Sequence, residues 1–292
     1  MKMSLLSVFA ILALAAGGAG ALESSSSGSF RVLKPEETRS IAELLGTEVP
    51  KGGGIVRVGA ANFAAGSGRI TFSEFPVGTQ NPTYPPASYG GTAADPTVTF
   101  RGFFAGQALG VVATCPPGAA ITGCVVGTPS NPLTLALTSP NTSIVNDGAN
   151  PTSPVLSGSP TFNGPIGILF DRDLAAVGLD GGFFDSVGST AITAFRRDGT
   201  VIGSVTNTTT GIEFLGLATA SGSETIAGFL FSLVGAEAAG FAIDNVRFAR
   251  AGQVIPPGGA APVVAVPATT PWGLLALVLA LLVAGAAFVR LR

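Results

Sequence analysis

The sequence contains no histidine, and only 11% of its 292 residues are charged. The absence of histidine excludes Ser-His-Asp and Cys-His catalysis and nearly all catalytic zinc sites. No glycine-rich phosphate loop ending in Lys and Ser or Thr is present. Lysine occurs only at Lys2, Lys34 and Lys51 and the formal net charge is −2, so no basic surface for nucleic acid is expected.

Cysteine is almost as scarce, since the chain has only Cys115 and Cys124. The residues between them are mostly proline, alanine and glycine. In an oxidising compartment this pair predicts a disulfide that closes one loop. A metal site would need further thiolate or imidazole ligands, which the chain lacks.

Glycine, proline and phenylalanine are abundant. The 41 glycines and 21 prolines suit short strands joined by tight turns, and the 19 phenylalanines supply apolar area for a core. Asp198-Gly199 lies between two alternating runs and predicts a hairpin turn. The spacing of the strand signals predicts an all-β fold, a β-sandwich or jelly roll. We expect strands at 55–58, 69–75, 97–104, 109–113, 133–137, 166–170, 174–179, 191–196, 201–206, 212–218, 226–234 and 241–248.

The N-terminus has the organisation of a secretory signal peptide. Lys2 precedes an apolar stretch at 5–16, and Ala19-Gly20-Ala21 supplies a cleavage site of small residues. We therefore expect residues 1–21 to be removed and the chain from Leu22 to be exported.

The C-terminal segment, residues 272–292, predicts a single transmembrane helix. The 18 residues from Trp272 to Val289 carry no charge and would span roughly 27 Å as a helix, enough to cross a bilayer core. Trp272 suits the membrane interface, and Arg290 and Arg292 mark the cytoplasmic side. The alternative is a buried globular helix, although such helices normally carry a polar face.

Between these ends we expect three regions. Residues 22–54 combine a Ser-rich stretch with a short helix at 35–46, where Pro35 suits the first turn. Residues 55–250 form the β-sandwich domain. Residues 251–271 are a linker rich in proline and glycine.

The C-terminal segment resembles the PEP-CTERM sorting signals of Gram-negative bacteria, which join a short proline-containing motif, one transmembrane helix and a basic end. Val266, Pro267, Trp272 and Gly273 resemble the IPTL-CTERM variant, although Ala268 and Thr269 depart from its Thr-Leu. The resemblance implies recognition by an exosortase-like membrane protease. The protein would first be anchored in the inner membrane facing the periplasm and then be processed to the cell surface or extracellular matrix. An anchor that is never cleaved is the alternative.

The strand block over 69–248 is similar to the β-sandwich of PEP-CTERM-type exported proteins, which is related to galactose-binding-like jelly rolls. The similarity is in four segments, 70–79, 177–185, 191–199 and 240–248.

This resemblance implies a structural calcium ion with Glu74 and Asp244 as ligands and Asp180 as a third, because Ca²⁺ prefers hard oxygen ligands. No other cofactor is expected. In the alternative interpretation, Asp244-Asn245 only caps a strand or turn.

Two further sets of residues are candidates for saccharide chemistry. Tyr84 and Tyr89, in one proline-rich loop, are candidates for a sugar-stacking platform, or they pack that loop against the sheet. Asp171 and Asp173 are candidates for a glycosidase carboxylate pair, or they are hydrogen-bonding residues of a turn.

The sequence as a whole favours an exported, non-enzymatic surface or matrix protein with a structural or adhesive role. Family resemblance alone links it to exopolysaccharide. A carbohydrate-binding module is the alternative, followed by a carboxylate-dependent glycoside hydrolase.

Overall fold

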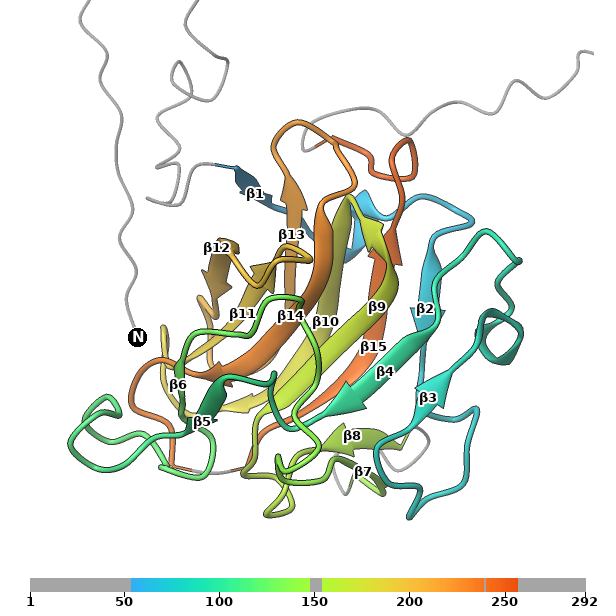
Figure 1. Cartoon of the computed structure of the whole chain (residues 1–292). Coiled ribbons are helices and arrows are strands. Elements are labelled where there is room, and N and C mark those ends of the chain that lie inside the picture. Colours follow the sequence, from blue (N-terminus) through green and yellow to red (C-terminus); the bar gives the residue numbers. More distant parts are fainter. Residues whose placement is uncertain (1–53, 148–153, 239, 257–292) are drawn as a thin grey trace, which may run out of the picture. The chain divides into compact units, whose positions relative to one another are not determined.

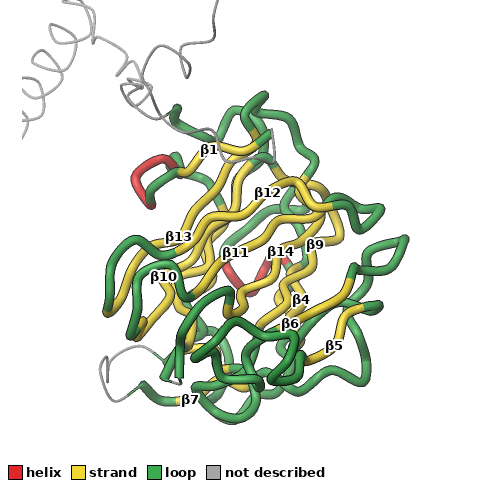
Figure 2. Tube along the Cα trace, turned by 90° about the vertical axis from the view of Figure 1, so that its left-hand side faces the viewer, coloured by secondary structure: helices red, strands yellow, loops and turns green. Residues whose placement is uncertain are grey.

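A computed structural model describes residues 54–147, 154–238 and 240–256, which fold into an all-β unit. Two antiparallel sheets form two layers (Figures 1 and 2). The predicted signal peptide, the short helix at 35–46, most of the linker and the segment 272–292 lie outside the described residues.

Within the described ranges, no helix is long and apolar enough to cross a membrane.

The first sheet has the order β1-β13-β10-β15-β8-β7. Its seventh strand, β2, lies outside this order and pairs with β15. Its strands are β1 (Ile55–Arg57), β2 (Gly68–Ile70), β7 (Ser143–Val145), β8 (Val155–Ser157), β10 (Ala176–Phe184), β13 (Gly211–Thr219) and β15 (Ala242–Ala249).

The second sheet has the order β12-β11-β14-β9-β4-β3. Its strands are β3 (Thr83–Tyr84), β4 (Val98–Arg101), β9 (Ile166–Leu174), β11 (Thr190–Phe195), β12 (Val201–Thr206) and β14 (Ile226–Leu233). A separate two-stranded ribbon pairs β5 (Gln107–Leu109) with β6 (Val125–Gly127), and two short 3₁₀ helices, η2 (Ala60–Asn62) and η3 (Pro86–Tyr89), lie in connections.

Strand β14 is buried at every position, which explains its continuous apolar sequence. Phe229 and Phe231 point into the core between the sheets. Ala227 and Leu230 point the other way, into a second cluster formed with residues of the excursion between β4 and β7. A strand covered on both faces cannot show the alternation of a half-exposed strand.

Aromatic side chains join the two sheets across the main core. The rings of Phe170 and Phe248, from opposite sheets, have centroids 5.5 Å apart. The ring of Phe231 lies 6.3 Å from Phe184 and 5.9 Å from Phe241. Such edge-to-face and tilted pairs contribute beyond the apolar area that they bury.

The strands predicted over the second half of the domain are confirmed, and so is the hairpin at Asp198-Gly199. There the amide of Arg196 donates to Thr200, and Gly199 adopts φ 82°, which suits glycine. The predicted strand 69–75 is shorter than expected and ends at Ile70, because Phe72 has φ 58°.

Other strand predictions fail in the first half of the domain. Segment 133–137 forms only an isolated bridge between Leu135 and Phe104, and of 109–113 only Leu109 belongs to a strand. Strands β3, β6, β7 and β8 were not predicted, because each has only two or three residues.

The predicted disulfide between Cys115 and Cys124 is confirmed, with the two Cα atoms 6.0 Å apart. It closes the loop that connects β5 to β6.

Truncation of Phe231 tests the importance of the core between the sheets. Phe231→Ala should lower the free energy of unfolding by about 3–5 kcal/mol, because it removes a buried ring and leaves a cavity between two other phenylalanines. Chemical denaturation of the mature protein measures the effect. Val201→Ala, at a site that is 59% exposed, is the control and should change stability little.

Candidate functional site

A pocket of about 110 Å³ opens on the outer face of the first sheet, where β10 ends and β15 begins. Leu179 and Ile243 point into the core, so the neighbouring Asp180 and Asp244 point outward. The polar side chains that line it are Asp147, Asp180, Asp244 and Asn245, and its largest apolar ones are Phe162, Phe183 and Ile212.

Glycines at outward positions of β10 leave this part of the sheet face without side chains. The outward positions of the strand are Gly178, Asp180 and Gly182, so one carboxylate rises between two glycines. A Cβ on Gly178 would lie 2.6 Å from the ring of Phe214, and one on Gly182 would lie 2.8 Å from the carbonyl oxygen of Gly211. Both sites therefore exclude a side chain.

Asp180 and Asp244 are directly opposite each other in the pairing of β10 with β15. The side-chain amide of Asn245 donates to both carboxylates, at 2.8 Å to Oδ2 of Asp180 and 3.2 Å to Oδ2 of Asp244. Its backbone amide also donates to Oδ1 of Asp244, at 2.6 Å. One residue thus holds two like charges side by side.

Arg69 fixes the orientation of the Asn245 amide. Its Nε and Nη2 donate to Oδ1 of Asn245 at 3.1 and 2.5 Å, so the NH₂ group must face the carboxylates. Arg69 is also the cross-strand partner of Arg247. Burial lowers the pKa of Arg247 and the charge of Arg69 lowers it further, whereas Asp180 acts in the opposite direction.

Two pocket residues adopt left-handed backbone conformations. Asn245 has φ 49° and Phe162 has φ 59°, which is unusual for a bulky residue. Phe162 is held there by hydrogen bonds, because its carbonyl accepts from the amides of Gly240 and Phe241 and its amide donates to Oγ of Ser157. Local strain of this kind concentrates at functional sites.

The rim of the pocket is apolar and accessible. The side chain of Phe183 is 43% exposed and that of Ile212 is 58% exposed. The pocket therefore combines acceptor carboxylates, those of Asp147, Asp180 and Asp244, with exposed apolar side chains.

The three residues predicted as calcium ligands do not come together. Asp180 and Asp244 meet, but the described residues contain no group of three or more His, Cys, Asp or Glu that could hold a metal ion. Oε1 of Glu74 instead accepts from the backbone amide and hydroxyl of Thr71. Between the two aspartates stands an N–H donor of Asn245, where a cation would need an oxygen. The calcium ion that the resemblance implies therefore stays a prediction.

The prediction that Tyr84 offers a sugar-stacking platform is wrong, because its side chain is completely buried. It packs among Phe72, Phe75 and Phe100, and burial raises its pKa, as does the charge of Glu74 to a smaller extent. The alternative interpretation, packing of the loop, describes this residue.

Tyr89 is half-buried and lies edge-on against Phe248. Its hydroxyl donates to the carbonyl of Pro96, and burial raises its pKa, with a further increase from Asp95. It is therefore also engaged in packing its own loop.

Asp171 and Asp173 each take part in separate contacts. Oδ1 of Asp171 accepts from the amide of Thr97 at 2.8 Å. Asp173 forms an ion pair with Arg197, which also donates to the carbonyl of Phe170. Both residues therefore form hydrogen bonds, as the alternative interpretation expected, but they lie in strand β9 and not in a turn.

Sequence reasoning missed Arg69, Phe162 and Phe183 as members of this site. The alternation of Gly178, Asp180 and Gly182 in the sequence could have indicated this site, because it predicts a strand face with few side chains. No family model matches the chain, and no curated protein matches it in sequence. The functional argument therefore depends on the chemistry of the pocket.

Two substitutions of Asn245 separate its backbone and side-chain roles. Both Asn245→Ala and Asn245→Gly remove the amide shared by the two aspartates, but only alanine is penalised at positive φ. Thermal and chemical denaturation should show the alanine variant less stable than the glycine variant by about 1 kcal/mol. Equal stabilities would contradict the strained conformation.

Proposed function

We propose that this chain is an exported, non-catalytic cell-surface protein with an adhesive role, whose pocket binds the end group of a saccharide. The observation that carries the proposal is the pairing of Asp180 and Asp244 through Asn245, next to the exposed side chains of Phe183 and Ile212. The proposed fold is a jelly roll.

The strand order supports the jelly roll. Let β2 be the first strand and β9 to β15 be strands two to eight, in chain order. The first sheet then contains the order one, eight, three, six, and the second contains two, seven, four, five. Two interlocked Greek keys produce this arrangement.

The chemistry of the pocket favours a neutral ligand rich in hydroxyl groups. Carboxylate oxygens accept hydrogen bonds from hydroxyls, and these charge-assisted bonds are stronger than those between neutral groups. Phe183 and Ile212 offer apolar contact for the C–H face of a sugar ring. Two carboxylates disfavour a phosphate or another anion, because like charges repel.

The volume favours a small end group over a long chain laid across the face. At about 110 Å³ the pocket is well below the ~300–1,000 Å³ of most small-molecule sites. We therefore expect recognition of one terminal residue of a polysaccharide or glycan.

The way in which the two acids are held supports the proposal of binding without turnover. Glycoside hydrolysis requires one carboxylic acid that donates a proton to the leaving oxygen. Here the Asn245 amide donates to both Asp180 and Asp244, which favours both as acceptors.

Export and sorting complete the proposal. The disulfide between Cys115 and Cys124 agrees with an oxidising compartment. The motif at Val266, Pro267, Trp272 and Gly273, followed by an uncharged run and terminal arginines, supports a membrane anchor that is cut by an exosortase-like protease.

Substitution in the pocket tests saccharide binding. The mature protein should bind members of an oligosaccharide array, and Asp180→Asn should weaken the affinity for the best ligand at least tenfold, about the effect of one charge-assisted hydrogen bond. Phe183→Ala should weaken it less. Asp185→Asn, exposed and outside the pocket lining, is the matched control and should bind normally. If Asp180→Asn and Phe183→Ala both bind the ligand as tightly as the wild-type protein, this pocket is not the saccharide site.

Intact-mass spectrometry of the protein recovered from its host tests sorting. Membrane and culture fractions should contain a species that begins at Leu22 and ends between about Pro256 and Trp272. If the only species is found in the membrane fraction and still ends at Arg292, the protein is a simple anchored domain and the sorting proposal fails.

A further inference from the structure

A long part of the domain carries no charge. The 45 residues between Arg101 and Asp147 include no Asp, Glu, Lys or Arg. This segment contains the ribbon β5–β6 and the loop closed by the disulfide, residues 110–124, which we call the uncharged tip.

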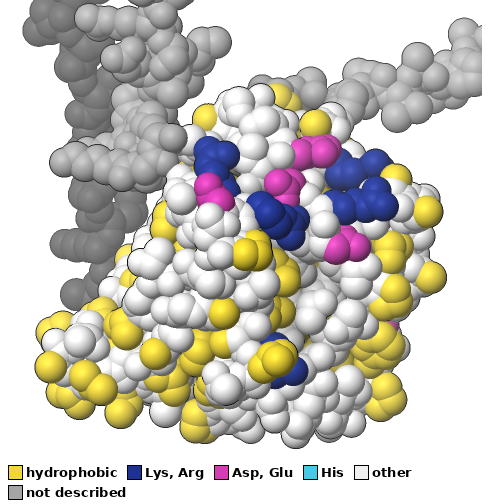
Figure 3. Space-filling view, in the orientation of Figure 1, with side chains coloured by type: hydrophobic (Ala, Val, Ile, Leu, Met, Phe, Trp, Pro, Cys, Tyr) yellow, Lys and Arg dark blue, Asp and Glu magenta, His cyan; other side chains and the backbone are white. Residues whose placement is uncertain are grey.

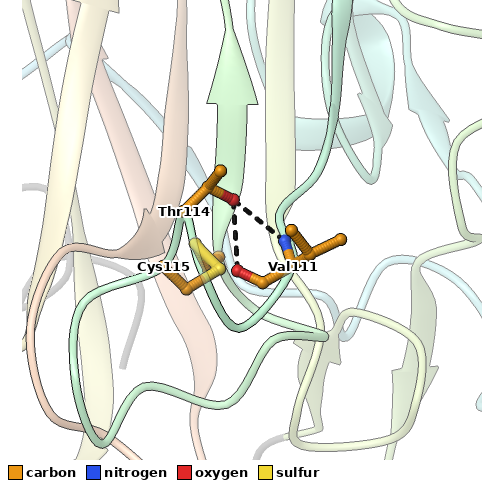
Figure 4. Close-up of a disulfide and its surroundings, with 4 residues drawn as sticks. Val111, Thr114 and Cys115 are labelled. Carbon is orange, nitrogen blue, oxygen red and sulfur yellow. Dashed lines mark hydrogen bonds between the residues drawn. A yellow bond between two sulfur atoms is a disulfide. The ribbon is translucent and has the colours of Figure 1, made fainter.

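The uncharged tip is held in a defined shape. In its first turn, beside the disulfide, the hydroxyl of Thr114 accepts a hydrogen bond from the amide of Val111 and donates one to the carbonyl of the same residue (Figure 4). The amide of Gly110 donates to Cys124, and the carbonyl of Gly123 accepts from Leu233 of β14. A surface ordered in advance loses little conformational entropy when it binds.

Apolar side chains point outward from this tip. Val112 is 83% exposed, Val111 is 59% exposed and Ile121 is 45% exposed. In Figure 3 the end of the molecule where this loop lies, at the lower left, shows hydrophobic side chains and no charged ones. Glu237, whose carbonyl accepts from Ala120, is only 1% exposed and its carboxylate accepts from Ser189 and the amide of Asp185.

The uncharged tip lies far from the point where the described chain ends. In Figure 1 the loop between β5 and β6 lies at the lower end of the sandwich, whereas the chain leaves at the upper end after Pro256. The uncharged tip and the C-terminal end of the described chain therefore lie at opposite ends of the sandwich.

We propose that the uncharged tip binds the same tip on a second copy of this chain, so that proteins anchored on two facing surfaces join end to end. A symmetric contact brings each residue of the patch close to its own copy or to a neighbour of that copy. A charged side chain in the patch would therefore lie close to its own copy and be repelled by it. A patch without charge avoids this repulsion.

Other occupants fit this surface less well. Segments that lie on membranes usually combine large apolar side chains with Lys or Arg that contact anionic lipids, and the tip has no basic residue. A saccharide needs several hydrogen-bonding side chains or an aromatic platform. Residues 110–124 contain no aromatic residue, and their only hydroxyl side chains are Thr114, which is bonded to Val111, and Thr122.

This inference rests on the proposed membrane anchor and deepens the adhesive role. The test uses the uncleaved chain, Leu22 to Arg292, in phosphatidylcholine vesicles of two populations, labelled with donor and acceptor dyes. Energy transfer should report tethering when both populations carry the wild-type protein. Val112→Asp should abolish it, because it places two carboxylates in the contact. Val201→Asp, at an exposed site of β12, is the matched control and should tether normally.

Cross-linking gives a second measurement. A short bis-maleimide should join Val112→Cys chains into dimers across tethered vesicles and leave Val201→Cys chains largely monomeric. The proposal is overturned if vesicle-bound chains neither tether nor cross-link, or if they bind protein-free vesicles equally well, since lipid would then be the partner.

A failure of the anchor is recognised separately, because the chain would not float with the vesicles. The cross-linking comparison and sedimentation are then made in solution, where monomers of Val112→Cys would overturn the tip contact. Saccharide binding is measured on the same samples and does not depend on either outcome.

Discussion

The fold depends on the burial of β14 on both of its faces. One face packs into the aromatic core shared with the first sheet, and the other is covered by the excursion between β4 and β7. Strands β9 and β11 pair with it on either side and satisfy its backbone groups away from water. The uncharged excursion is therefore part of the core: without it, Leu230 and its neighbours would face solvent.

The central strands could be predicted because their signals are local. β12 has the predicted bounds and β11, β13 and β14 differ only at their ends, and Asp198-Gly199 fixes the β11–β12 hairpin. The short strands β3, β7 and β8 could not, because two or three residues are too few to show an alternating pattern, and β8 also pairs with a strand distant in sequence. β8 meets β15 through Leu156 and Ile243. No local pattern reports such a contact.

The candidate site could be predicted only in part, for the same reason. Asp180 and Asp244 were candidates from the sequence, and the register of β10 with β15 brings them together. The hydrogen bond from Arg69 that turns the Asn245 amide toward them depends on the pairing of β2 with β15. Tyr84 misled because composition cannot distinguish an exposed aromatic ring from one that is completely buried.

The described chain enters and leaves the sandwich at the same end, since Gly54 precedes β1 and Pro256 follows the last bridge, both at the top of Figure 1. Residues added or lost before Gly54 or after Pro256 would therefore leave the opposite end of the sandwich, with the uncharged tip, unchanged. The length of either flank and the shape of the uncharged tip can thus change independently of each other.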